Sequence, residues 1–219
     1  MRRTREVAEL TTRELAPHEV VLSTDEMTSI QPRPRTAPTQ PAQAGRAVQV
    51  EHEYARKGAR NLFAAFNTRT AQVIGACVVR KRQVEFIALL EQVLTTFDAS
   101  ITTIHLICDN VSVHHGKQVQ AWLAQHPRIV LHFLPVHSSW MNQVEQWFSI
   151  LRRKRLKCQN FSDLPELTAA IEQFIAEWNQ TGQPFKWTAA SFEKVLAQAA
   201  AEIAQAAVCL PEPVPDAAA

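Results

Sequence analysis

The chain has 219 residues, 46% of them hydrophobic, which is enough for one domain with a buried core and terminal extensions. Its net charge of +2 excludes a strongly polyanionic or polycationic protein, and no apolar run is long enough to predict a membrane span. The cysteines lie too far apart in sequence to indicate a zinc ribbon or a redox pair, which favours reduced thiols.

The first part of the chain predicts a short helix and three strands. Residues 1–17 indicate a short polar helix or a linker. The apolar run 20–22 predicts a buried strand that stops at Asp25 and Glu26. Proline-rich residues 31–46 predict an extended loop, and two β-type runs separated by a polar turn then predict a hairpin, with strands at 61–68 and 72–80.

The second part of the chain alternates helices with strands and ends in helices. Apolar runs at 104–108, closed by Asp109 and Asn110, and at 129–134 predict two more strands. Ser138 or Ser139 is a candidate cap for the helix that follows. Helical spacing of apolar residues predicts helices at 83–97, 117–125, 140–157, 163–180 and 189–208, ahead of a disordered tail at 209–219. The order predicts an α/β fold in which helices flank a mixed five-stranded sheet.

Three acidic residues are candidates for a metal site. Asp25 and Asp109 each follow an apolar strand, and ligand sites of open α/β sheets collect at the carboxyl ends of strands. Glu145 lies beside the apolar stripe of helix 140–157. Carboxylates brought together repel each other, and a hard divalent cation relieves the repulsion. From the pattern alone, the alternatives stay open: the aspartates could form turns, and Glu145 could be a solvated helical glutamate.

The residues around these carboxylates resemble those of the DDE superfamily endonucleases, in particular bacterial insertion-sequence transposases related to the mariner group. The resemblance covers about residues 18–190 and is most specific in the block that contains Glu145. The matching segments are LSTDEMTSIQ (22–31), HEYARKGARNLFAAFN (52–67), IHLICDNVSVH (104–114), HFLPVHSSWMNQVEQWFSILRRKRL (132–156) and FKWT (185–188).

This resemblance implies a ribonuclease-H-like catalytic domain at 18–190 in which Asp25, Asp109 and Glu145 hold Mg²⁺ or Mn²⁺, with two ions expected. It implies an enzyme that nicks the ends of a transposable element and joins the 3′-hydroxyls to target DNA. The partners expected are element and target DNA, with a homodimer or larger assembly on DNA. The location expected is the bacterial cytoplasm, at the nucleoid.

Basic residues are candidates for phosphate contact, in two groups: Arg56, Lys57 and Arg60, and then Arg152, Arg153, Lys154 and Arg155. For the second group, favourable interaction with a helix C-terminus is the alternative. Three polar residues next to the carboxylate motifs are candidates for supporting the site: Asn110, His137 and Asn142.

One departure from the family is the short segment before the first strand. Family members usually begin with a helix-turn-helix DNA-binding domain, whereas residues 1–17 are too few for one. We therefore expect this domain to be separate or fused elsewhere. Two other hypotheses stay open: a non-catalytic, truncated transposase remnant that only binds DNA, and a different metal-dependent nuclease on the same fold.

Overall fold

The computed structural model describes residues 2–135, 138–157, 159–188 and 190. Its centre is one five-stranded sheet with the order β3-β2-β1-β4-β5. The strands are β1 (Glu19–Ile30), β2 (Arg60–Asn67), β3 (Val73–Val78), β4 (Thr103–Cys108) and β5 (Ile129–Phe133). The helices are α1 (Arg2–Thr12), α2 (Gln83–Thr96), α3 (Ser112–His115), α4 (Lys117–Gln125), α5 (Gln143–Leu151) and α6 (Leu164–Thr181). The predicted α/β class with a mixed sheet is confirmed.

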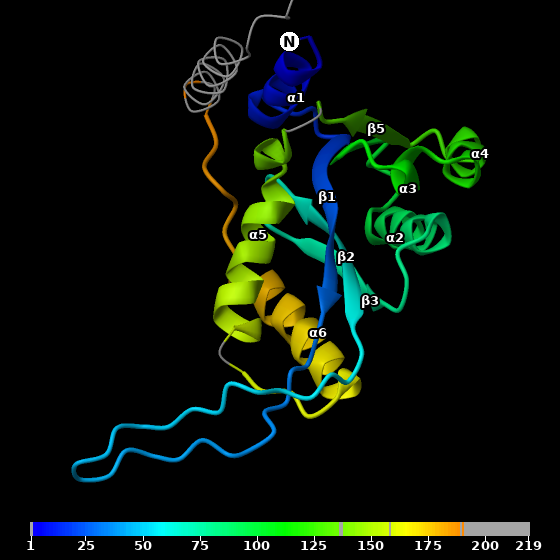
Figure 1. Cartoon of the computed structure of the whole chain (residues 1–219). Helices are drawn as coiled ribbons and strands as arrows, with labels where there is room; N and C mark the ends of the chain where they lie inside the picture. The colour runs from blue at the N-terminus through cyan, green and yellow to red at the C-terminus, as the bar shows by residue number, and fades with distance from the viewer. Residues whose placement is uncertain (1, 136–137, 158, 189, 191–219) are drawn as a thin grey trace, which may run out of the picture.

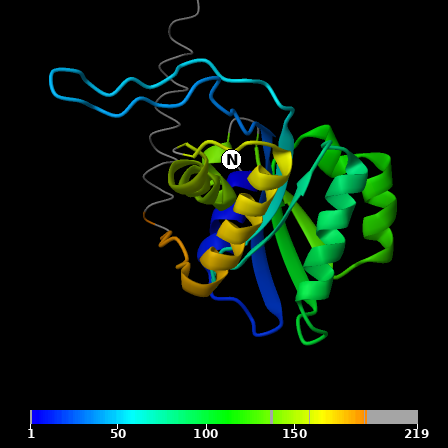
Figure 2. The same cartoon turned by 90° about the horizontal axis from the view of Figure 1, so that it is seen from below.

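Strand direction changes at β1. The first three strands form an antiparallel meander, as the predicted hairpin requires, whereas β4 and β5 run parallel to β1. Parallel neighbours need a crossover, and α3 and α4 supply it between β4 and β5, while α2 connects the edge strand β3 to β4. Figures 1 and 2 show α5 and α6 on one face of the sheet and α2 and α4 on the other.

Strand β2 shows why the sheet is covered on both faces. Its side chains alternate in direction, so Leu62 and Phe66 pack with α5 and α6, whereas Phe63 packs against Phe86 of α2. All of these side chains are buried. A third apolar cluster joins Val7 of α1 to the sheet, so the predicted N-terminal helix is part of the folded unit.

Strand β1 is longer than predicted. It does not stop at Asp25 and Glu26 but continues to Ile30, because it pairs with β2 as far as that residue. The strand continues past the end of β4, whose pairing with β1 ends at Ser23. Asp25 therefore lies within β1 and not after it, which corrects the prediction.

The helix predicted at 140–157 is divided into three parts. A 3-10 turn (Ser139–Met141) precedes α5, and a π turn (Arg152–Leu156) follows it. Ser138 makes no side-chain cap hydrogen bond, so a Ser138 cap is wrong; Ser139 lies inside the 3-10 turn. The predicted helices near 163–180 and 117–125 are confirmed as α6 and α4, while the short α3 was not predicted.

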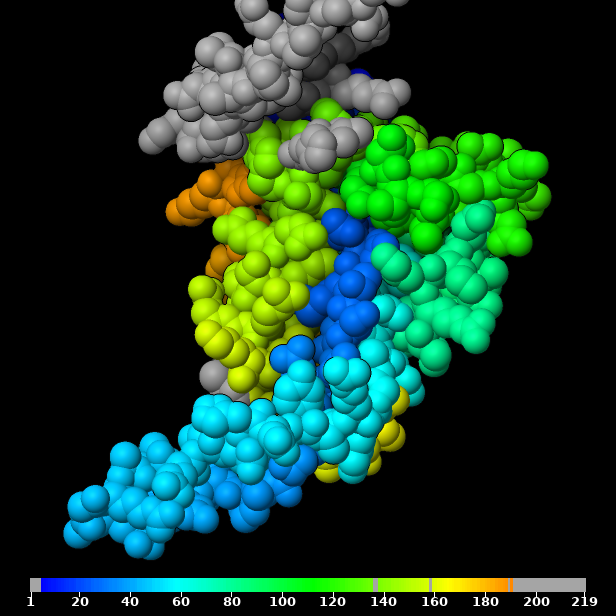
Figure 3. Space-filling view, in the orientation of Figure 1, coloured from blue at the N-terminus to red at the C-terminus, as the bar shows by residue number. Residues whose placement is uncertain are grey.

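Residues 31–59 form a long two-stranded arm between β1 and β2 (Figures 1 and 3). Isolated bridges hold its two limbs together, including Arg35 to Tyr54 and Gln40 to Gln49. The predicted extended loop is the outgoing limb of this arm. The predicted C-terminal helix beyond residue 190, the tail at 209–219 and His137 lie outside the described residues.

Candidate active site

The sheet register brings Asp25 and Asp109 together. Ser23 of β1 pairs with Ile107 of β4 in the last parallel rung, and each aspartate lies two residues further along its own chain. Asp25 is also paired with Ala64 of β2, whose side chain packs on the α5 and α6 face. Directly paired residues of antiparallel strands share a face, so Asp25 points toward α5.

Asn142 fixes the start of α5 to β1. Its side-chain amide donates to Oδ2 of Asp25 and to the carbonyl of Thr24, both at 2.9 Å. Its Oδ1 accepts a short hydrogen bond from Ser23, whose hydroxyl oxygen accepts in turn from the backbone N–H of Val144 at 2.9 Å. Ser23 therefore caps α5 from another element. Asn142 is 1% exposed, so these bonds form in a dry interior.

Glu145 lies in the first turn of α5, where this network places it beside Asp25. Burial raises the pKa of Glu145, and its hydrogen bond with Asp25 opposes that effect. Asp109 and Glu26 add repulsion of the same sign as burial. A carboxyl group at a helix N-terminus also interacts favourably with the helix dipole. The predicted three carboxylates thus influence one another directly.

The pKa of the Asp25 carboxyl group is strongly raised. Its side chain is 7% exposed, and burial is the main cause that raises its pKa to about 7. The hydrogen bond from the backbone N–H of Glu26 opposes this shift, while Asp109, Glu145 and Glu26 reinforce it by repulsion. A buried carboxyl group surrounded by carboxylates is a place where positive charge is favoured.

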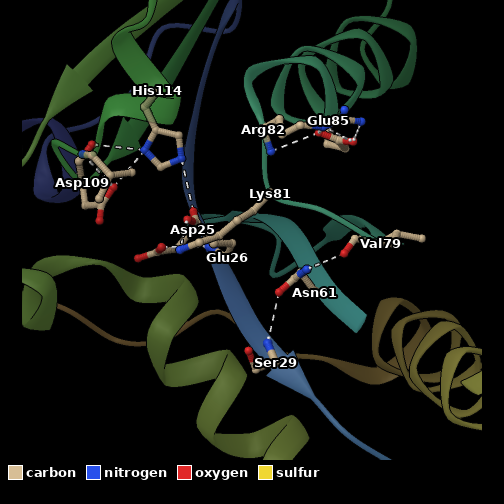
Figure 4. A network of polar contacts seen from close by, with 11 residues as sticks. Asp25, Glu26, Ser29, Asn61, Val79, Lys81, Arg82, Glu85, Asp109 and His114 are labelled. Carbon is tan, nitrogen blue, oxygen red and sulfur yellow. Dashed lines mark hydrogen bonds and ion pairs between the residues drawn. The ribbon is translucent and has the colours of Figure 1, made fainter. Parts of the chain in front are cut away.

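Two residues that were not predicted, Glu26 and His114, complete the cluster (Figure 4). His114 of α3 is fully buried, and its Nδ1 lies 2.8 Å from Oδ1 of Asp109. Its Nε2 lies 3.4 Å from Oε2 of Glu26. Burial acts to lower the pKa of His114, but its bonds to Asp109, Cys108 and Glu26 outweigh burial and raise it. The sequence signal was present, since both residues belong to the matching segments 22–31 and 104–114.

The predicted basic residues divide into two kinds. Arg152, Arg153 and Lys154 are exposed on the π turn, beyond the helix that carries Glu145. Arg155 differs, since it forms an ion pair with Glu177 of α6.

At the arm, Arg56 and Lys57 are exposed near its return to the sheet, and Arg60 is the first residue of β2. Of the predicted supporting residues, Asn110 is exposed next to Asp109.

The sequence pattern of the DDE superfamily endonucleases matches residues 20–168, which span β1 to the start of α6 and include all three carboxylates. The chain belongs to this family. A curated relative, the insertion element IS630 uncharacterized 39 kDa protein of Shigella sonnei, is 28% identical to this DDE-family chain over 124 residues. The match takes in 57% of the chain but 35% of the relative, so the chain spans about a third of that protein's length.

Solved structures show the same fold. The Mos1 mariner paired-end complex with Mn matches with a TM-score of 0.55 at 12% identity, over 83% of this chain and 55% of that one. The simian T-cell lymphotropic virus intasome matches with a TM-score of 0.53 at 16% identity, over 94% of this chain and 60% of that one. The ribonuclease-H-like fold of this DDE-family domain is therefore confirmed. Within the residues described, no helix is both long and apolar enough to cross a membrane.

Proposed function

We propose that the chain is a transposase catalytic core that cleaves DNA and joins DNA strands with the help of divalent metal ions. Asp25, Asp109 and Glu145 are the proposed metal ligands, and residues 18–190 the proposed catalytic domain. The observation that carries the proposal is the buried Asp25, whose pKa is raised by burial and by the neighbouring Asp109 and Glu145. Removing this repulsion is what a bound dication does.

The donor set fits Mg²⁺ or Mn²⁺, which prefer carboxylate oxygens. Among the described residues, no three His, Cys, Asp or Glu side chains are yet gathered around one point, so ion binding would require the carboxylates to turn inward. Both side-chain contacts described for Asp109 end on Oδ1, which leaves Oδ2 for an ion. Bound ions would activate a 3′-hydroxyl or a water as the nucleophile and would stabilise the leaving 3′-oxygen.

The protein's own contribution is positioning. Asn142 holds Asp25 and the backbone of β1 in one hydrogen-bonded unit, and Ser23 holds the first turn of α5 against it. This unit keeps Glu145 next to Asp25 through the uncharged side chains of Asn142 and Ser23. The backbone segments that carry Asp25 and Glu145 would therefore be held in place for the reacting phosphodiester, a requirement of phosphoryl transfer by positioning.

DNA contact is proposed at the base of the arm and along the π turn. A cavity of about 730 Å³ lies between them, and its lining includes four arginine or lysine residues, Arg33, Arg35, Arg152 and Lys157, together with Tyr54 and the acidic residues Glu51 and Glu53. These cations suit a phosphate backbone. The proposed contact surface also includes five further basic residues: Arg56, Lys57, Arg60, Arg153 and Lys154. Arg155 is left out because Glu177 already neutralises it.

Two further parts of the proposal concern assembly. The paired-end and intasome neighbours are complexes by their names, and we infer that this chain also works as a dimer or larger assembly on element and target DNA. A helix-turn-helix domain, fused or separate, would supply recognition of the element ends. The enzyme would act at the nucleoid of the bacterial cytoplasm.

Strand transfer tests the function. The purified chain is given a precut oligonucleotide with a free 3′-hydroxyl, a plasmid target and Mg²⁺ or Mn²⁺. We expect joined product from the wild type and from Glu172→Gln, an exposed α6 control. We expect none from Asp109→Asn or Glu145→Gln. Joined product from both of these variants would contradict the proposed set of metal ligands. Cleavage without joining would favour a different nuclease, and DNA binding without either reaction a non-catalytic remnant.

A further inference from the structure

His114 is a polar side chain enclosed in the protein. It is 0% exposed, and its ring lies 4.4 Å from the ring of Phe86, so α2 covers one side of it. It belongs to α3, a single turn that directly follows β4 and Asp109. A buried imidazole that gains nothing from water must be held by its polar partners.

Its two nitrogens reach carboxylates from different strands (Figure 4). Nδ1 lies 2.8 Å from Oδ1 of Asp109 and also hydrogen-bonds with the backbone carbonyl of Asp109 at 3.2 Å. Oδ1 of Asp109 accepts in addition from the backbone N–H of Val111 at 3.4 Å. Nε2 faces Glu26 of β1, at 3.4 Å from its Oε2. The Glu26 side chain is 5% exposed, and its other oxygen faces Lys81 at 3.4 Å. His114 thus lies between the segment after β4 and β1, within 3.4 Å of a carboxylate oxygen from each.

We propose that His114 is a positioning residue for the metal ligand Asp109, and that Glu26 in turn orients His114. This inference rests on the proposed function, in which Asp109 is a metal ligand. The chain Glu26–His114–Asp109 fixes Oδ1 of Asp109 and directs Oδ2 to the ion. Groups that hydrogen-bond metal ligands orient them in this way, and their loss costs about 10- to 100-fold in metal affinity.

The arrangement also accounts for Glu26. A glutamate directly after Asp25 adds repulsion to a carboxylate that is already buried. As a partner of Lys81 alone it would be a weak ion pair, since the Lys81 side chain is 50% exposed. Because its Oε2 lies 3.4 Å from Nε2 of His114, Glu26 also gives the buried ring a second polar neighbour, on β1.

Mn²⁺ binding to the full chain without DNA tests the proposal, measured from the free-ion signal in electron paramagnetic resonance. His114→Leu keeps the packing on Phe86 and removes both contacts. His114→Asn keeps an amide N–H at about the place of Nδ1. The matched control is His105→Leu. His105 lies on β4, but its side chain contacts Glu19 and His132 and not the proposed metal ligands. Thermal unfolding is followed for every variant.

We expect His114→Leu to weaken Mn²⁺ binding about 10- to 100-fold, with His114→Asn restoring most of it and the His105 control unchanged. Glu26→Gln alone should also weaken Mn²⁺ binding. Combined with His114→Leu it should cause no further loss, because Glu26 is proposed to act on Asp109 only through His114. Wild-type affinity in folded His114→Leu and His114→Asn, with Asp109→Asn still defective, would overturn the positioning role and leave the metal site standing. A wild type that binds no Mn²⁺ would overturn both proposals.

Discussion

Replacing Asp25 with asparagine should stabilise the metal-free protein, and more so at higher pH. Between pH 3.8 and about 7 the unfolded chain has ionised Asp25 while the folded chain keeps the proton. Folding then requires proton uptake, so raising the pH destabilises the folded state. The asparagine of the variant does not titrate and is free of this penalty. The proposed metal ligand Asp25 is thus expected to lower the stability of the metal-free protein.

The magnitude follows from the two pKa values. A folded-state pKa of about 7 against 3.8 in the unfolded chain corresponds to a penalty of about 1.5 kcal/mol at pH 5 and about 4 kcal/mol at pH 8. The advantage of the variant should therefore grow by about 2 to 3 kcal/mol between these pH values. The asparagine places an amide opposite Asn142, but that mismatch costs the same at both pH values and cancels in the difference.

Urea unfolding in EDTA at pH 5 and pH 8, followed by tryptophan fluorescence, measures this difference. The control is Asp98→Asn, an exposed carboxyl group whose pKa is lowered by its bonds to Ser100. Its effect should not change between the two pH values, because Asp98 is ionised in both states. An advantage of Asp25→Asn that is equal at pH 5 and pH 8 would refute the reasoning, because Asp25 would then titrate like an ordinary aspartate.

Two more predictions concern the hydrogen-bonded unit and the basic surface. Asn142→Ala should cost about 1–3 kcal/mol in urea unfolding, because it leaves buried partners on β1 unpaired, whereas Gln146→Ala on the exposed side of α5 should cost little. Unchanged stability in Asn142→Ala would contradict the unit. Arg152→Ala and Arg153→Ala should each reduce the slope of log affinity for duplex DNA against log salt by about 0.9. Arg155→Ala should leave that slope unchanged because of its intramolecular ion pair, and an equal loss from all three would show that the pair opens on DNA.

Local patterns in the sequence predicted the architecture well. Apolar runs predicted β4, which Asp109 follows, and its parallel neighbours β1 and β5, since a buried parallel strand is continuously apolar. The helical spacing of apolar residues predicted the face that α5 buries, and Val144, Phe148 and Leu151 on that face are all buried. That face determines where Glu145 emerges. The position of this carboxylate was thus readable from periodicity alone.

What the sequence did not show depends on contacts between distant segments. The polar residues Thr24 to Glu26 looked like the end of a strand, yet pairing with β2 carries β1 to Ile30. No local pattern indicates that Ser23 caps α5 through the N–H of Val144, which lies 121 residues further along the chain. No local pattern indicates that His114 lies between two carboxylates, because they belong to β1 and to the segment after β4. The DNA-contacting residues remain predictions, because charge patterns do not tell a phosphate contact from a solvated side chain.

The claim that Asp25, Asp109 and Glu145 bind the ions is tested most directly by diffraction from crystals soaked in Mn²⁺. Anomalous scattering locates the ion without reference to the protein. We predict a peak within about 2.0–2.3 Å of oxygens from Asp25 and Asp109, with Glu145 at the same peak or at a second one about 3.5–4 Å away. Ordered Mn²⁺ elsewhere on the surface, with the three carboxylates free of it, would contradict the account.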